Sequence, residues 1–148
     1  MSFKSQENNM RRLAALLGHD LGYIAGEQES GPNGDKKAFM NVGKTFLRAL
    51  AKDLSLRNAI VKSNAGGIGV SGDCCLTGMW ESNGLYLCIT QPCFGQNVLM
   101  FRSVRSLRDY RGGYNHFINR QKLARLDYAT LLNHLLALRK DGIYERAA

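Results

Sequence analysis

The sequence predicts one α+β domain, in which helices flank an antiparallel sheet of three to four strands arranged as a meander. Two observations predict this class: apolar residues recur at helical spacing near both ends of the chain, and they alternate with polar residues through its middle. The chain has 148 residues, the size of one ordinary domain, so residues 1–148 are assigned to a single unit. We expect N-terminal helices first and a C-terminal helix packed on one face of the sheet.

The N-terminal part of the chain is expected to be helical. Residues 1–9 are polar and are expected to be flexible, and the first helix is predicted to begin near Asn9. Its leucines recur at helical spacing: Leu13, Leu16, Leu17 and Leu21. Residues 27–35 are rich in turn-forming residues and are expected to form a flexible loop. A second helix is predicted after Asp35, a favourable N-cap residue, through residues 36–54.

The middle of the chain shows the period-two pattern of strands with one buried face. Residues 56–64 contain a short β-branched run that is a candidate for the first strand. In residues 66–80 the apolar positions share one parity, as Cys74 and Leu76 do. Turn residues follow at positions 82–84 and predict a hairpin to the next strand.

Two further strands and a terminal helix complete the predicted domain. Residues 84–91 alternate in the same way and end before Pro92, and residues 98–104 form the last predicted strand. Residues 119–142 are predicted to form the terminal helix, either directly or after a short strand. Asp127 is a favourable capping residue within this segment.

The chain carries a formal net charge of +8 at neutral pH, which favours an anionic partner and nucleic acid in particular. A basic protein without such a partner is the alternative, so the distribution of the charge has to decide. No apolar run approaches the roughly 18 residues that span a bilayer, and no apolar segment follows the basic residues of the N-terminus. We therefore expect no membrane association and a cytoplasmic location.

The strongest functional signal is a basic segment with interleaved aromatic residues, in which Asp109 is the one acidic residue. Guanidinium groups bind phosphate well because they are planar, always charged and bidentate, and aromatic rings can stack on unpaired bases. The alternative is a solvated edge whose tyrosines pack into the core. The candidate residues for binding nucleic acid or a protein partner are Arg102, Arg105, Arg108, Tyr110, Arg111, Tyr114, His116, Arg120, Lys122 and Arg125.

Four cysteines are present, and their spacing does not favour a metal site. A structural zinc site needs two matched pairs of ligands, whereas Cys74 and Cys75 are adjacent, and Cys88 and Cys93 are separated by four residues. Adjacent strand residues also point to opposite faces. We expect reduced thiols that serve mainly as small apolar side chains, and we predict no metal and no cofactor.

Catalytic signatures are weak in this sequence. The glycines of residues 67–72 have the spacing of a dinucleotide-binding loop, but a strand and not a helix is predicted after them. No spacing rule supports a nuclease-like site composed of Asp73, Asp109, His116 and an arginine. We therefore expect a protein that is not an enzyme, with a small nuclease-like enzyme as an alternative.

Three segments resemble a group of short accessory proteins carried by bacterial plasmids and phages: GGIGVSGDCCL, NGLYLCITQ and FRSVRSLRDYRGGYNHF. The resemblance covers residues 60–120. That group has no established activity, so it implies no catalytic residue for this chain. It implies the setting of a mobile genetic element, where small proteins serve DNA maintenance, transfer or the evasion of host defence.

Three functions follow from these observations. The first is a non-enzymatic basic module of the mobile-element type that binds DNA or RNA through the phosphate backbone. The second is a phage- or plasmid-encoded inhibitor that binds a host defence complex or nuclease, with exposed arginines and tyrosines as anchors. The third is the small nuclease-like enzyme. A homodimer is compatible with each of them.

Overall fold

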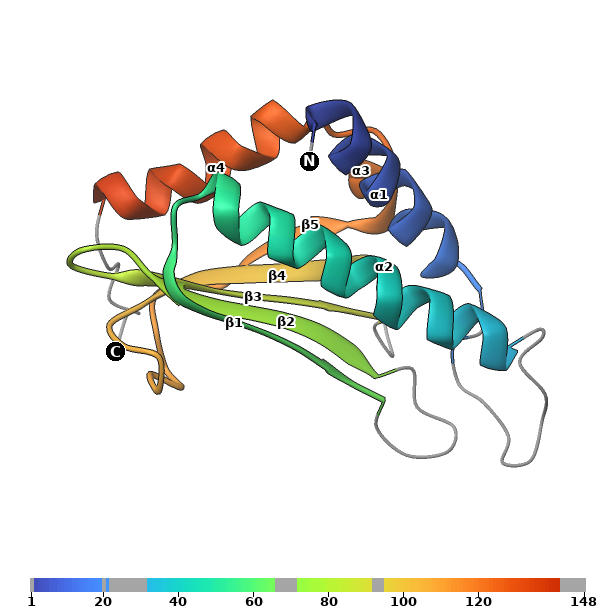
Figure 1. Ribbon diagram of the computed structural model, residues 1–148, viewed down its shortest axis with the longest axis horizontal. Coiled ribbons are helices and arrows are strands. Elements are labelled where there is room, and N and C mark those ends of the chain that lie inside the picture. The colour runs from blue at the N-terminus through green and yellow to red at the C-terminus, as the bar shows by residue number, and fades with distance from the viewer. Residues whose placement is uncertain (1, 20, 22–31, 66–71, 92–94, 142–148) are drawn as a thin grey trace.

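Helices cover one face of an antiparallel sheet in the computed structural model of the protein (Figure 1). The structure describes residues 2–19, 21, 32–65, 72–91 and 95–141. The helices in these ranges are α1 (Phe3–Leu16), α2 (Pro32–Asp53), α3 (Arg120–Leu123) and α4 (Tyr128–Asp141). The strands are β1 (Arg57–Asn64), β2 (Asp73–Met79), β3 (Gly84–Thr90), β4 (Asn97–Val104) and β5 (His116–Asn119).

The five strands follow one another in chain order, and each pair of neighbours is antiparallel. This meander and its flanking helices confirm the predicted fold class. The candidate strand in residues 56–64 is β1, but the sheet has one strand more than the predicted maximum of four. The additional strand is β5, which has four residues and pairs with β4 at one edge of the sheet. The sequence allows a short strand before the terminal helix as an alternative, but within residues 119–142, because a strand of four residues is too short for alternation to locate.

Both N-terminal helices begin earlier than predicted. α1 begins at Phe3 because Ser2 caps it, with its hydroxyl accepting a hydrogen bond from the Ser5 amide at 3.1 Å. α2 begins at Pro32, a residue whose fixed backbone angle suits the first helical position. Asp35 therefore lies in the first turn of α2 and not before it.

The predicted terminal helix is divided into two. Asn119 caps the short α3 by accepting a hydrogen bond from the Lys122 amide at 2.7 Å, and the chain turns before α4 begins. Asp127 directly precedes α4, and its carbonyl oxygen accepts the Leu131 amide at 3.1 Å. This carbonyl contact is typical of the N-cap position, which is the position that the sequence favoured for Asp127.

The buried face of the sheet follows the alternation seen in the sequence. Every second residue of β2 and β3 is buried, including Cys74, Leu76, Leu87 and Ile89. α2 lies against β1 and β2, and α4 lies against β3 and β4 (Figure 1). The opposite face of the sheet carries no described helix, so the helices form one layer on one side.

Two side chains of the β2–β3 turn join the sheet to the C-terminal ends of helices. The Trp80 indole donates a hydrogen bond to the Leu54 carbonyl just after α2 at 2.8 Å. The buried Asn83 amide donates to the Leu138 carbonyl in α4 at 2.9 Å. Both contacts satisfy carbonyls that a helix end leaves without an intrahelical donor.

A hydrogen-bonded hub around Tyr128 joins the three long helices. The Tyr128 hydroxyl donates a hydrogen bond to a carboxylate oxygen of Asp53 at 2.6 Å and accepts one from the Gln6 side-chain amide at 3.2 Å. The same Gln6 amide donates to the Phe46 carbonyl at 3.0 Å, and the Tyr128 amide donates to Glu7 at 2.9 Å. Tyr128 and Gln6 are fully buried, so these bonds satisfy polar atoms that water cannot reach.

Replacing Tyr128 by phenylalanine keeps the ring and removes the hydroxyl. We expect the free energy of unfolding to fall by about 1–2 kcal/mol, because the bond to Asp53 and one bond to Gln6 are lost. Urea denaturation would show a lower midpoint with an unchanged slope. Tyr110→Phe removes the same group from a side chain that is 85% exposed, and should change this free energy by less than about 0.5 kcal/mol. Equal effects would contradict the role given to Tyr128.

Candidate functional site

The fold divides the predicted basic segment into two groups. Arg102 lies on β4, and the next three arginines of the segment lie in the loop of residues 105–115, which we call the arginine loop. Arg120, Lys122 and Arg125 follow β5. Because Asn119 pairs with Asn97 at the start of β4, this second group lies at the other end of the strand, roughly 20–25 Å away.

A single carboxylate organises the arginine loop. Asp109 accepts hydrogen bonds from the backbone amides of Arg105, Arg111 and Gly112, at 2.9, 3.1 and 2.9 Å. The bond from Gly112 is the main reason that the pKa of Asp109 lies below its ordinary value, followed by the bond from Arg105. Asp109 therefore holds the loop in shape, and its charge is already committed to backbone donors.

The loop presents its charged and aromatic side chains to solvent. Tyr110 is 85% exposed and Tyr114 is 45% exposed. The arginines at positions 105, 108 and 111 are also exposed. The prediction that the tyrosines might instead pack into the core is therefore wrong for these two residues.

The arginine loop folds back toward the face of the sheet opposite the described helices. The Arg102 guanidinium donates a hydrogen bond to the Tyr110 carbonyl at 3.2 Å, and the Gly113 amide donates to the Ser103 carbonyl at 2.9 Å. Gly112 has a φ of +60°, and a Cβ there would lie 2.6 Å from the Ser103 carbonyl. Figure 1 shows the loop, in orange, on the side of the sheet away from the helices.

The face opposite the helices, which we call the open face, receives side chains from every strand. One row crosses all five strands through directly paired residues: Lys62, Cys75, Cys88, Met100 and Phe117. A parallel row pairs Ile60, Thr77, Tyr86 and Arg102. The open face is partly apolar, with Phe117 at 54% exposure and Ile60 at 43%, and it has basic side chains near both edges.

Arg102 joins the open face to the arginine loop. Its guanidinium carbon lies 4.7 Å from the centre of the Tyr86 ring, within the range of a cation–π interaction. The same side chain bonds the Tyr110 carbonyl in the loop. Arg102 therefore links the Tyr86 ring on the open face to the backbone of the arginine loop.

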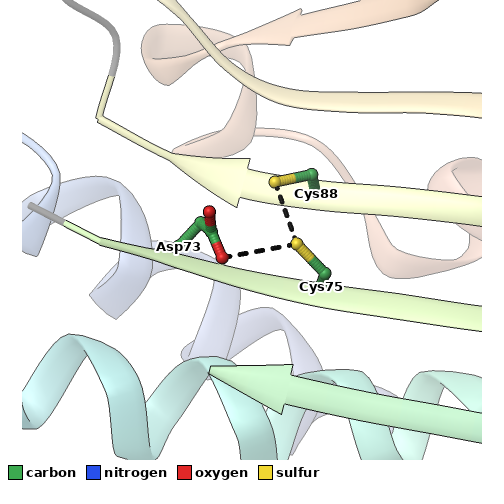
Figure 2. A group of neighbouring side chains, drawn as sticks. All are labelled: Asp73, Cys75 and Cys88. Atoms are coloured by element: carbon green, nitrogen blue, oxygen red, sulfur yellow. Dashed lines mark hydrogen bonds between the residues drawn. The ribbon is translucent and has the colours of Figure 1, made fainter. Parts of the chain in front are cut away.

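Three side chains near the middle of the open face form a cluster that the sequence analysis missed (Figure 2). Asp73 and Cys75 lie on the same side of β2. Cys88 lies on the neighbouring strand β3, directly opposite Cys75. The sulfur atoms of Cys75 and Cys88 are 3.1 Å apart, and a carboxylate oxygen of Asp73 lies 3.5 Å from the Cys75 sulfur. The ligand atoms of all three lie within 4.8 Å of one another.

The thiols of the chain differ in environment. Hydrogen bonding from the Cys75 thiol lowers the pKa of Cys88, and the same bond, with burial, raises the pKa of Cys75. Burial raises the pKa of Cys74 to about 12 on the helix-covered face, where this thiol acts as the predicted small apolar side chain. The half-buried Cys75 and Cys88 depart from that prediction, and Cys93 lies outside the described residues.

His116 and Arg120 do not join the exposed basic surface. His116 lies on the helix-covered side of β5, stacked on Phe101 with ring centres 5.0 Å apart. The Arg120 guanidinium donates to the Ala14 carbonyl of α1 at 3.4 Å and lines a shallow hollow of about 300 Å³. Lys122 and Arg125 are exposed, but they follow the C-terminal end of β5, whereas the arginine loop precedes its N-terminal end.

The structure does not bring together the three named residues of the predicted nuclease-like site. Asp73 lies on the open face at the start of β2 and accepts a hydrogen bond from Asn64 at 3.0 Å. His116 lies on the opposite face, and two strands separate β2 from β5. Asp109 binds its own loop. Of the dinucleotide-like glycines, Gly72 alone lies within the described residues, and its φ is +78°.

Comparison of the chain with protein-family models, with curated proteins and with solved structures found no match. None of the described helices has the length and apolar character that crossing a membrane requires. Function therefore has to be inferred from the surface itself.

Replacing Asp109 by alanine should release the arginine loop. We expect the amides of Arg105, Arg111 and Gly112 to lose protection from hydrogen exchange, since each loses its acceptor. NMR-detected exchange measures this protection. Amides of the β2–β3 pairing should be unchanged, and Glu81→Ala, which removes an exposed carboxylate, should leave the loop protected. Persistent protection in Asp109→Ala would contradict this role.

The same contacts predict how the loop responds to acid. The folded pKa of Asp109 lies below its unfolded value of about 3.9, so its contribution is fully present above that pH. The contribution is lost as the pH falls through the lower, folded pKa. The Gly112 amide shift should therefore titrate with a midpoint below about 3.9. A midpoint above that value would contradict the charge-assisted bonding.

Proposed function

We propose that the protein binds single-stranded nucleic acid on the open face and the arginine loop, without catalysing a reaction on it. The observation that carries the proposal is the position of Arg102, which contacts the Tyr86 ring on the sheet and the Tyr110 carbonyl in the loop. Through these contacts Arg102 links the open face to the arginine loop, and this link supports a single binding surface that includes both.

The arginine loop supplies the groups that would contact phosphate. Arg105, Arg108 and Arg111 are exposed within seven residues of chain, and the one carboxylate among them accepts three backbone amides. The positive charge of the loop is therefore only partly offset. Together with the net charge of +8, this favours a polyanion.

The aromatic side chains supply surfaces on which bases would stack. Phe117 is 54% exposed on the open face, and Tyr110 and Tyr114 are exposed in the loop. Exposing an aromatic ring to water is unfavourable in free energy, and a partner that covers the ring removes this cost. Every nucleic-acid base has a flat aromatic face that can stack on such a ring. Bases in a duplex are already stacked on one another, so this part of the surface favours an unpaired strand.

Removing two loop arginines should weaken binding more than removing two basic residues elsewhere. We expect Arg108→Gln/Arg111→Gln to bind a labelled single strand about tenfold or more weakly at low salt, with a slope of log K against log salt that is smaller by about 1–2. Lys122→Gln/Arg125→Gln changes the net charge equally at the other end of β4 and should retain most of the affinity. Fluorescence anisotropy at roughly 50 and 200 mM salt measures both.

The outcome of this comparison separates the three functions. Equal losses of affinity in the two double variants would mean that only the net charge of the protein matters. That result would contradict a binding site at the arginine loop. Absence of binding to single-stranded DNA, duplex DNA and RNA would contradict the proposal as a whole, and would favour the inhibitor of a host defence complex or nuclease. Cleavage of any probe would instead favour the nuclease-like enzyme.

Replacing Phe117 by alanine should weaken binding to single strands selectively. We expect a loss of about 5-fold to 150-fold, since stacking on one base contributes about 1–3 kcal/mol. The weaker affinity for duplex DNA should be unchanged. Ile60→Ala is the matched control, because it removes an apolar side chain of similar exposure from the other edge of the open face. Equal effects of Phe117→Ala on single strands and duplex would contradict stacking.

A further inference from the structure

The cluster on the open face has the composition of a metal site. Asp73, Cys75 and Cys88 offer one carboxylate and two thiols, with all ligand atoms within 4.8 Å of one another (Figure 2). Two thiolates favour a soft or borderline cation, whereas Mg²⁺ and Ca²⁺ require mainly oxygen ligands. The composition is therefore suited to Zn²⁺.

One of the distances in the cluster equals that of tetrahedral zinc, and another is shorter. With bonds of about 2.0 Å to oxygen and 2.3 Å to sulfur, a tetrahedral ion separates an oxygen and a sulfur ligand by about 3.5 Å and two sulfur ligands by about 3.8 Å. The Asp73 oxygen and the Cys75 sulfur are 3.5 Å apart. The two sulfurs are 3.1 Å apart, so small side-chain rotations would have to separate them by about 0.7 Å.

The surroundings of the cluster hold the ligands in place. Asn64 on β1 donates a hydrogen bond to the Asp73 carboxylate at 3.0 Å, which orients it from the neighbouring strand. All three ligands lie on regular, directly paired strands. Lys62 pairs with Cys75 from the other side and supplies a positive charge near three anionic ligands.

We propose that Asp73, Cys75 and Cys88 bind a thiophilic divalent cation, represented by Zn²⁺, and leave one coordination position open to solvent. Three protein ligands are one fewer than a closed structural site needs, so water or a ligand would occupy the fourth position. This site lies on the proposed binding face, but the inference rests on the cluster alone and does not require nucleic-acid binding.

A disulfide between Cys75 and Cys88 is the competing chemistry. Directly opposite residues of antiparallel strands have Cα separations of about 4.5–5.5 Å, which a disulfide tolerates. A disulfide, however, would require the sulfurs to approach by about 1 Å and gives no role to the Asp73 carboxylate. The metal site accounts for all three side chains, and the experiment below distinguishes the two.

The test uses the full-length protein, reduced, stripped with a chelator and kept without oxygen. Zn²⁺ is then titrated in competition with a chromogenic indicator, and Co²⁺ is used as a spectroscopic probe of tetrahedral thiolate ligation. We expect one equivalent of Zn²⁺ per chain and a thiolate-to-cobalt charge-transfer band. Cys75→Ser and Cys88→Ser should each weaken Zn²⁺ binding by about 100-fold or more, and Asp73→Asn by about 10-fold to 100-fold.

Cys74→Ala is the matched control, because it removes the neighbouring thiol from the opposite, buried face. This variant should bind Zn²⁺ like the wild type. Circular dichroism of the three ligand variants checks that the fold is kept, which is expected because their side chains lie outside the helix-covered core. A variant that keeps the fold and still binds one equivalent with wild-type affinity would overturn the assignment of that ligand.

Two results would overturn the proposal as a whole. One is a fully reduced wild type that takes up no Zn²⁺ and gives no thiolate-to-cobalt band. The other is a Cys75–Cys88 disulfide in the untreated protein, seen as two missing titratable thiols, together with no Zn²⁺ uptake after reduction. That pattern would identify a redox pair. Nucleic-acid binding is measured separately, so its failure would leave this result unaffected.

Discussion

The hub at Tyr128 is the interaction on which the helical layer depends. One buried side chain and its backbone amide join α4 to α1 through Gln6 and Glu7, and to α2 through Asp53. The same Gln6 amide reaches the Phe46 carbonyl in α2. Because these bonds are buried, a helix that left the layer would leave polar atoms without partners. The hub thus keeps all three long helices on one side of the sheet.

A one-sided helical layer has a direct consequence for the other face. Every strand sends half of its side chains to the open face, and the register of four antiparallel pairs aligns them in rows. Antiparallel sheets tolerate such exposure when the outer face is polar. Here that face also carries Phe117 and a thiol pair, which a purely structural outer face does not need. This excess of specialised side chains motivates both proposals.

The two proposals share a surface but rest on different chemistry. Nucleic-acid binding relies on charge and aromatic area at the β4–β5 end, whereas metal binding relies on three ligands nearer the start of β2. Binding of Zn²⁺ would release the protons of the two thiols, so the formal charge of the cluster would be the same with and without the ion, on a face that also carries Lys62 and Arg102. The proposed functions are therefore electrostatically compatible, and each can be removed by substitution without altering the residues of the other.

Local patterns in the sequence determined much of the fold. Helical spacing and alternation predicted the fold class, both N-terminal helices, four of the strands and the buried parity of Cys74 and Leu76, because these features depend on periods of 3.6 and 2 residues. The hairpin predicted at residues 82–84 contained a further signal. A turn between Met79 and Gly84 pairs Cys75 with Cys88, so the thiol pair could have been inferred from the register.

Tertiary structure alone decided how the basic segment is used. Basic residues of one continuous segment of the chain were separated by the fold: Arg120, after β5, donates a hydrogen bond to α1, whereas Arg108 lies in an exposed loop. The four-residue β5 is defined by its pairing with β4, and that same pairing turned His116 toward the helices. Hydrogen bonding between distant segments has no local pattern. For this reason the sequence by itself determined the elements and their buried faces, while the composition of each surface was decided only by the fold.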